Sequence, residues 1–171
     1  MDTINEKGIL YGASITITQE NIHNVTSDDF ISELYRRGCK IVFCVEYIPV
    51  NSTVKNLALT NKERDLLDKM LSKLRNKFDD MIFISFPGDE KSSGGCLAAG
   101  RGFFHINSQG SAEPCPFSPY SDTNIRNTSL IEALKSPLFM KLSDDHILQE
   151  HTGGCVLFEQ EEIVKKLCAL N

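Results

Sequence analysis

Three cysteines lie in sequence contexts that suit a metal site. Cys96 is followed by thirteen residues, then Gly110, then four residues and Cys115, while Cys155 ends a second Gly-Gly-Cys segment like the one at Cys96. A glycine permits a turn with positive φ, so this spacing predicts a β-hairpin that brings Cys115 back beside Cys96. Thiolates are the ligands that zinc and iron–sulfur clusters prefer, and adjacent glycines let backbone N–H groups approach sulfur. We therefore expect Cys96, Cys115 and Cys155 to be metal ligands.

Buried cysteines also serve as small hydrophobic side chains, and this alternative stays open for the six cysteines of the chain. It suits Cys44 best, because Cys44 lies inside an apolar run, and Cys39 at the start of that run fits it too. Cys168, near the end of a predicted helix, is expected to lie apart from the metal site.

The sequence leaves the fourth ligand open. His151 precedes Cys155 by four residues, which is a workable ligand spacing, and Asp145 is an alternative. Three cysteines with His151 would also satisfy tetrahedral zinc. His105, inside the predicted hairpin, is expected to be a structural polar residue. Asp89 and Glu90 are expected to form a solvated turn.

The secondary-structure elements that must position these residues alternate between strand and helix. Residues 8–18, 40–50 and 80–87 are apolar and β-branched, which is typical of strands, and residues 26–37 and 60–78 have helical spacing. Strand–helix–strand–helix–strand with short connections predicts parallel strands joined by right-handed crossovers, with both helices on one side. The fold class is therefore predicted to be α/β with a βαβαβ core.

The composition changes after residue 87, where Gly, Ser, Pro and Asn become frequent. An aromatic strand at 102–107 is expected to fold into a hairpin, and Ser129 with Glu132 forms a capping box for a short helix that Pro137 interrupts. Further helices are expected near residues 143–150 and 159–170. We expect two domains, residues 1–87 and a small α+β domain at 88–171.

The cysteine spacing resembles the first half of the SPASM/twitch pattern of radical-SAM enzymes, Cys–x(9–15)–Gly–x4–Cys. The flanking segments at residues 94–107, 113–119 and 127–137 are similar to that region of bacterial radical-SAM proteins. The resemblance implies that residues 1–87 form the second half of a partial (β/α)6 barrel. It also implies that residues 88–171 bind an auxiliary [4Fe–4S] cluster.

The resemblance implies two further site residues. Ser14 on the first strand and Glu46 on the second would face the nucleoside of S-adenosylmethionine, as cofactor-binding residues of a complete parent enzyme. Of the later Cys–x2–Cys–x5–Cys–x3–Cys run of the full SPASM pattern, only Cys155 is present. This departure implies the shorter, twitch-like form with one auxiliary cluster.

Cleavage of S-adenosylmethionine in this family needs Cys–x3–Cys–x2–Cys, and no two cysteines of this chain have either spacing. The chain is therefore expected to be a truncated or split radical-SAM-type protein that is inactive alone. The two rivals are a zinc-organised binding module and a metal-free folded remnant that acts through protein–protein contacts. The expected partners are a second copy or a protein supplying the missing half-barrel, with a peptide substrate in the complete enzyme.

Composition excludes several other functions. The formal net charge is −5, from 18 basic and 23 acidic residues, which argues against a nucleic-acid surface. No apolar run approaches the ~20 residues of a membrane span. The N-terminal residues lack the pattern of a signal peptide, so we expect a cytoplasmic protein whose cysteines are thiols or metal ligands.

Overall fold

The computed structural model describes residues 1–49, 56–144, 148 and 155–169. The chain forms two compact units, Met1–Asp89 and Glu90–Asn171. The division falls two residues from position 87, where the composition changes. No helix in these described ranges is long and apolar enough to cross a membrane.

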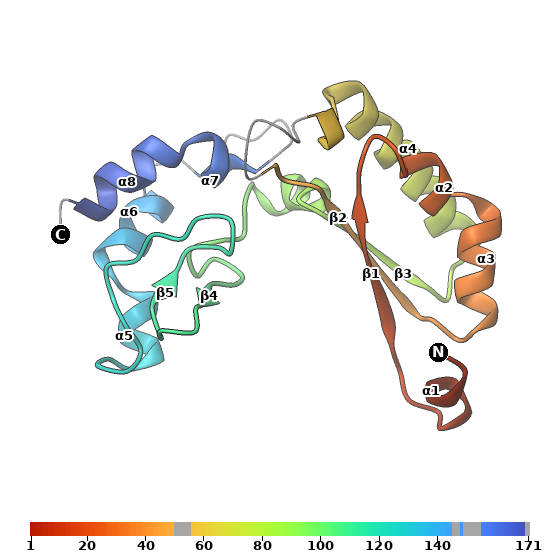
Figure 1. The fold of residues 1–171 in the computed structure, drawn as a ribbon, viewed down its shortest axis with the longest axis horizontal. Coiled ribbons are helices and arrows are strands. Elements are labelled where there is room, and N and C mark those ends of the chain that lie inside the picture. Colours follow the sequence, from red (N-terminus) through yellow and green to blue (C-terminus); the bar gives the residue numbers. More distant parts are fainter. Residues whose placement is uncertain (50–55, 145–147, 149–154, 170–171) are drawn as a thin grey trace. The chain divides into compact units, whose positions relative to one another are not determined.

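The first unit is built on a parallel sheet in the order β1-β2-β3, which confirms the coarse α/β class (Figure 1). Its strands are β1 (Gly12–Ile17), β2 (Ile41–Glu46) and β3 (Ile82–Phe86). The helices α3 (Asp28–Arg36) and α4 (Asn61–Lys77) lie on the same side of the sheet, as expected for two right-handed crossovers. Two short helices were not predicted: α1 (Asp2–Glu6) and α2 (Ile22–Val25).

Side-chain caps explain where the two longer helices begin. The Ser27 hydroxyl accepts from the Phe30 amide, which satisfies an N-terminal donor of α3 that has no partner within the helix. At α4, the predicted capping box is present: Thr60 accepts from the Glu63 amide, and the Glu63 carboxylate accepts from the Thr60 amide over 2.7 Å. Both starts follow from local sequence.

One face of the sheet makes the core of the first unit. Alternate strand residues Ile17, Val42 and Phe83 are buried with apolar side chains from α3 and α4. The helical members of this cluster are Ile31, Leu34, Leu67, Leu71 and Leu74. The strand residues that face the other side of the sheet are more exposed to solvent. Phe43 is 40% and Ile82 57% exposed. Among the described residues of the first unit, helices therefore cover one face of the sheet.

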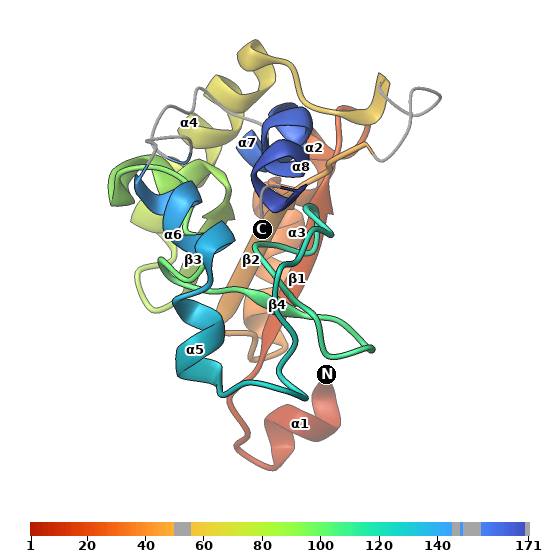
Figure 2. The same ribbon diagram turned by 90° about the vertical axis from the view of Figure 1, so that its left-hand side faces the viewer.

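The second unit contains the predicted hairpin and a set of short helices. It begins in a 3-10 helix, Gly88–Ser93, and its antiparallel strands are β4 (His105–Ile106) and β5 (Ala112–Glu113). The helices are α5 (Leu130–Leu134), α6 (Pro137–Asp144), α7 (Val156–Glu159) and α8 (Glu161–Ala169). Within this unit α8 contacts α6 and α7 (Figures 1 and 2).

Local sequence also explains the turns of the second unit. Gly110 has φ +85°, as predicted, and its amide donates to the Asn107 carbonyl over 2.9 Å to close the hairpin turn. The capping box of Ser129 and Glu132 is present at α5. Pro137 does more than end that helix, because it is the first residue of α6, where a missing N–H costs nothing. Most of the helix expected at 143–150 lies outside the described residues.

Candidate metal site

The Cys96 loop has an unusual backbone. Gly94, Gly95 and Gly100 have φ of +78°, +104° and +81°, and Ala99 has φ +54°. The Arg101 guanidinium donates to the Cys96 carbonyl over 2.6 Å and to the Gly94 carbonyl over 3.2 Å. These positive φ values give the loop the sharp turns that glycines allow, and Arg101 holds its carbonyl groups.

The amides that follow Cys96 each have a specific acceptor. The Leu97 amide donates to the Glu90 carboxylate over 3.0 Å, and the Ala98 amide lies close enough to the Cys96 sulfur to lower the pKa of that thiol. The next amide, that of Ala99, donates to the Pro114 carbonyl over 3.0 Å. The loop therefore cradles its own sulfur and is tied to the residue that precedes Cys115.

The same sulfur–amide arrangement recurs at the other two cysteines. The Phe117 amide lowers the pKa of the Cys115 thiol, and the amides of Leu157 and Phe158 lower that of Cys155, although burial outweighs both effects. In all three cases a donor lies two residues after the cysteine. N–H groups aimed at sulfur stabilise a thiolate and tune the potential of a cluster bound to it.

Without a metal, the three thiols are neutral at physiological pH. Burial raises the pKa of Cys96 to about 12, and the charges of Glu90, Cys115 and Cys155 add to the rise. Burial likewise raises the pKa of Cys115 to about 11, with contributions from Cys155 and Glu90. The pKa of Cys155 is raised by burial first and by Glu90 second. The charges that raise the pKa values of these thiols are all negative, so a bound cation would lower those pKa values instead.

Cys96 and Cys115 belong to one buried cluster, Cys155 is half-buried and packs against it, and the three thiols lie within electrostatic reach of one another. Across the described ranges, however, no three His, Cys, Asp or Glu side chains are grouped closely enough to count as a ready site for one metal ion. His151, Asp145, Gly153 and Gly154 lie outside the described residues.

A buried hydroxyl next to Cys115 lacks a partner. Ser118 is 1% exposed, and its Oγ has no hydrogen-bond partner in the part of the chain that the structure describes. Its amide donates to the Cys115 carbonyl over 2.9 Å, so the hydroxyl belongs to the same turn. A buried donor without an acceptor costs roughly 1–3 kcal/mol, which an anionic group held by the cysteines would recover.

The two predicted nucleoside-binding residues do not come together. Ser14 pairs with Phe43 and Glu46 with Ile17, so Ser14 and Glu46 point to opposite faces of the sheet. Glu46 is buried on the helix-covered face, and its Oε1 accepts from Arg64 Nε over 2.8 Å. This ion pair occupies the carboxylate within the first unit, whereas Ser14 is exposed.

The expectation of a solvated turn holds for Asp89, whose side chain is 42% exposed, but not for Glu90, which is buried. The Asp89 carboxylate accepts from Arg75 over 2.7 Å and from the Ser85 amide over 2.7 Å. Glu90 is 3% exposed and accepts from the Leu97 amide. No local sequence pattern indicated the burial of Glu90.

The remaining predicted polar residues have structural partners. His105 Nδ1 lies 2.8 Å from Glu113 Oε2, across the hairpin, which agrees with a structural role. Cys39 and Cys44 are buried in the core of the first unit, as expected for small hydrophobic side chains. Cys168 packs against the core of the second unit and donates its thiol to the Ser121 carbonyl over 3.4 Å.

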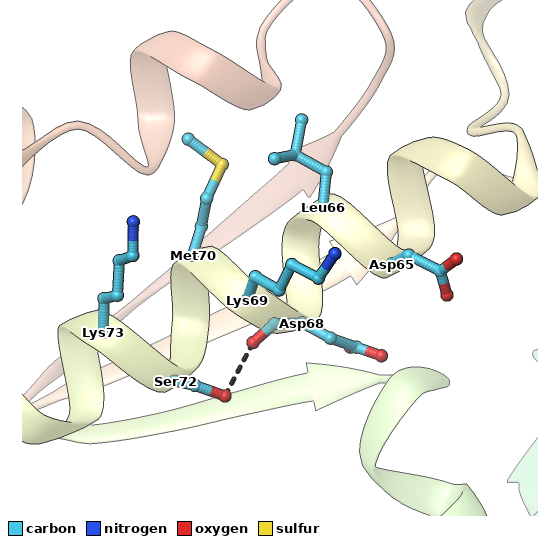
Figure 3. A pocket seen from close by; sticks show the side chains of 7 residues that line it. All are labelled: Asp65, Leu66, Asp68, Lys69, Met70, Ser72 and Lys73. Atoms are coloured by element: carbon cyan, nitrogen blue, oxygen red, sulfur yellow. Dashed lines mark hydrogen bonds between the residues drawn. The ribbon is translucent and has the colours of Figure 1, made fainter.

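A depression of about 660 Å³ lies on α4 and is unconnected with the cysteines (Figure 3). Its described lining residues belong to this one helix: Asp65, Leu66, Asp68, Lys69, Met70, Ser72 and Lys73. The Ser72 hydroxyl donates to the Asp68 carbonyl over 2.8 Å, an ordinary contact along a helix. Residues from one helix do not enclose a ligand, so this surface is not the candidate site.

The three cysteines thus remain candidate ligands from their sequence context, although the described residues form no ready metal site. The resemblance of the chain to the radical-SAM pattern stays a prediction from sequence. No protein-family model and no curated protein matches this chain.

Proposed function

We propose that residues 90–171 bind an auxiliary [4Fe–4S] cluster through Cys96, Cys115 and Cys155, as part of a radical-SAM-type protein. One observation carries this proposal. Three cysteines far apart in sequence lie in or against one core, and the amide two residues after each cysteine lowers the pKa of its thiol. Cysteines that merely fill space have no need of such repeated donors.

The first unit is proposed to be a half-barrel fragment of the same kind of protein. Its parallel β1-β2-β3 order, with α3 and α4 on one side, suits a barrel segment with helices outside. Ser14 and Phe43 would then belong to the interior face. Glu46, which pairs with Arg64, would lie on the opposite, helix-covered face from Ser14.

A bound cluster would relay electrons, or would bind a donor atom of a substrate through one of its irons. The residues of this chain would hold it: the three cysteines as ligands, the amides of Ala98 and Phe117 as donors to sulfur. These 171 residues contain no Cys–x3–Cys–x2–Cys motif. We therefore expect no 5′-deoxyadenosine from S-adenosylmethionine when the reconstituted and reduced chain acts alone.

Anaerobic reconstitution with iron and sulfide tests the cluster. The wild-type chain is expected to turn brown and to hold about four iron per chain. The triple variant Cys96→Ser, Cys115→Ser, Cys155→Ser is expected to hold none.

The matched control replaces the other three cysteines by alanine: Cys39, Cys44 and Cys168. This control variant should retain the wild-type iron and sulfide content, because these residues lie outside the proposed ligand set. Equal iron in both triple variants would contradict the proposal. A colourless wild-type chain that holds about one zinc would instead favour the zinc-organised module.

A further inference from the structure

The three-stranded sheet of the first unit has two edge strands, β1 and β3 (Figure 2). Along an edge strand, alternate residues direct their N–H and C=O groups away from the sheet, where another chain can pair with them. The Tyr47 amide donates to the Ile17 carbonyl, and the Ile82 amide donates to the Lys40 carbonyl. Ile17 and Ile82 therefore face β2. The outward groups belong to the even-numbered residues of β1 and to the odd-numbered residues of β3.

Charged side chains occupy the outward groups of β3. The Arg75 guanidinium donates to the Phe83 carbonyl over 2.9 Å, and the Asp89 carboxylate accepts from the Ser85 amide over 2.7 Å. Arg75 also pairs with Asp89 over 2.7 Å. One ion pair thus takes an outward acceptor and an outward donor near the middle of β3. Charged groups in this position keep another strand from pairing with the edge.

The Asn21 side chain closes only one end of β1. Its Oδ1 accepts from the Thr18 amide over 2.9 Å, and its Nδ2 donates to the Thr16 carbonyl over 2.9 Å. One side-chain amide thus takes both bonds that a neighbouring strand would make there. Within the part of the chain that the structure describes, the outward N–H and C=O groups of Gly12 and Ser14 have no hydrogen-bond partner.

The open half of β1 is small and uncharged. The strand reads Gly-Ala-Ser-Ile-Thr-Ile, without a charged residue or a proline, and both Gly12 and Ser14 are exposed. Lysine and proline are residues that commonly protect an edge. A partner strand along the whole of β1 would need the Thr16 carbonyl, which Asn21 occupies. An antiparallel strand centred on Ala13 would need only the backbone groups of Gly12 and Ser14.

We propose that a second copy of the chain adds to this edge, with the two β1 strands antiparallel about a two-fold axis at Ala13. Gly12 of one copy then lies opposite Ser14 of the other and exchanges both N–H···O bonds with it, and the axis repeats the pair. Gly12 places no side chain opposite Ser14, and Ala13 has only a methyl group at the axis, so the strands can approach closely. The two three-stranded sheets become one. This dimer does not depend on cluster binding.

Backbone amide hydrogen exchange of the wild-type chain at several concentrations, with light scattering of the same samples, tests the interface. The Gly12 and Ser14 amides should exchange rapidly in dilute protein and become protected as the mass approaches twice 19.1 kDa. The Ala13 and Ile15 amides face β2 and should be protected at every concentration. A chain that stays at 19.1 kDa overturns the proposal. So does a dimer in which the Gly12 and Ser14 amides stay unprotected.

Two variants should move the dimerisation equilibrium in opposite directions. Ser14→Pro removes an outward N–H and leaves the groups that face β2, so it should weaken the dimer about tenfold or more. Asn21→Ala frees the Thr16 carbonyl and lengthens the open edge, so it should tighten the dimer about tenfold. Protection of the amides that face β2 shows that each variant keeps its sheet. A dimer that neither variant changes overturns the assignment of this edge.

Discussion

The amide of Ala99 donates to the carbonyl of Pro114 over 3.0 Å and so joins the Cys96 loop to the segment that leads into Cys115. Ala99 is the non-glycine residue with positive φ, +54°, among those that the structure describes. A left-handed conformation costs an L-residue roughly 1–2 kcal/mol. The hydrogen bond between Ala99 and Pro114 therefore offsets part of the conformational free energy that Ala99 loses.

The hairpin turn between those segments should depend on Gly110. A Cβ at this position would lie 2.8 Å from Asn124 Oδ1 and 3.1 Å from Arg126 Cγ, at φ +85°. We expect Gly110→Ala to lower the free energy of unfolding by about 2 kcal/mol or more, the left-handed cost plus the clash. Urea denaturation measures this. Gly8→Ala is the control, because φ there is +64° but no atom lies within 4 Å of the new Cβ, and it should cost less. Equal losses would show that the contacts of Gly110 are unimportant.

The ion pair of Glu46 and Arg64 should behave as a buried pair. Glu46 is 6% and Arg64 22% exposed at the side chain. Arg64→Met leaves a buried carboxylate without its cation and is expected to destabilise the first unit by about 3 kcal/mol. Adding Glu46→Gln should recover at least half of that loss, as measured by chemical denaturation.

An exposed ion pair supplies the comparison. Lys77 Nζ lies 2.7 Å from Asp28 Oδ2, with side chains 51% and 65% exposed. Lys77→Met should cost less than about 1 kcal/mol, because solvent screens such pairs. A cost for Arg64→Met that is no larger than this would contradict the buried role of Glu46.

The three thiols should make the metal-free protein sensitive to alkaline pH. Burial raises the pKa of Cys96 to about 12 and that of Cys115 to about 11, from an ordinary 9.0. A group whose pKa is raised on folding stabilises the fold below its unfolded pKa, and that contribution is lost as pH rises through the folded value. Thermal unfolding temperatures should therefore fall from pH 9.0 upward. The variant with alanine at Cys96, Cys115 and Cys155 should show a smaller fall, and identical profiles would contradict this.

The open face of the first sheet should promote self-association. Ile82 is 57% and Phe43 40% exposed on the side that α3 and α4 do not cover. The sheet also has edges at β1 and β3, where backbone groups can pair with another chain. Light scattering is expected to give a mass above 19.1 kDa that rises with concentration. Ile82→Lys should reduce the mass, and Ile131→Lys, at an exposed position of the second unit, should not. A constant 19.1 kDa for the wild-type chain would exclude a dimer.

Much of the fold was predictable because its causes are local. The capping boxes at Thr60 and Ser129 are set by residues three positions apart, and the turn at Gly110 by its own φ. The order of strands and helices followed from periodicity in the same way, and with it the parallel sheet. Short-range geometry does not depend on which distant segments later pack against it.

The sequence predicted only some of the residues of the candidate site. Spacing singled out Cys96, Cys115 and Cys155, since glycines and a hairpin signal surround them. It gave no indication that Glu90 is buried, or that the Ser118 hydroxyl lacks a partner among the described residues. Burial is a property of distant segments meeting, and a single local pattern does not contain it.

The two faces of the sheet also show which features the sequence determined and which only the tertiary structure decided. The sequence determined that β1 and β2 are strands, and alternation along each strand determined which of its residues share a face. Only the tertiary structure decided that Ser14 pairs with Phe43 and Glu46 with Ile17, which puts the two candidates on opposite faces. Register depends on how separate strands align, and Arg64 of α4 reaches Glu46 only after the helix has packed on the sheet.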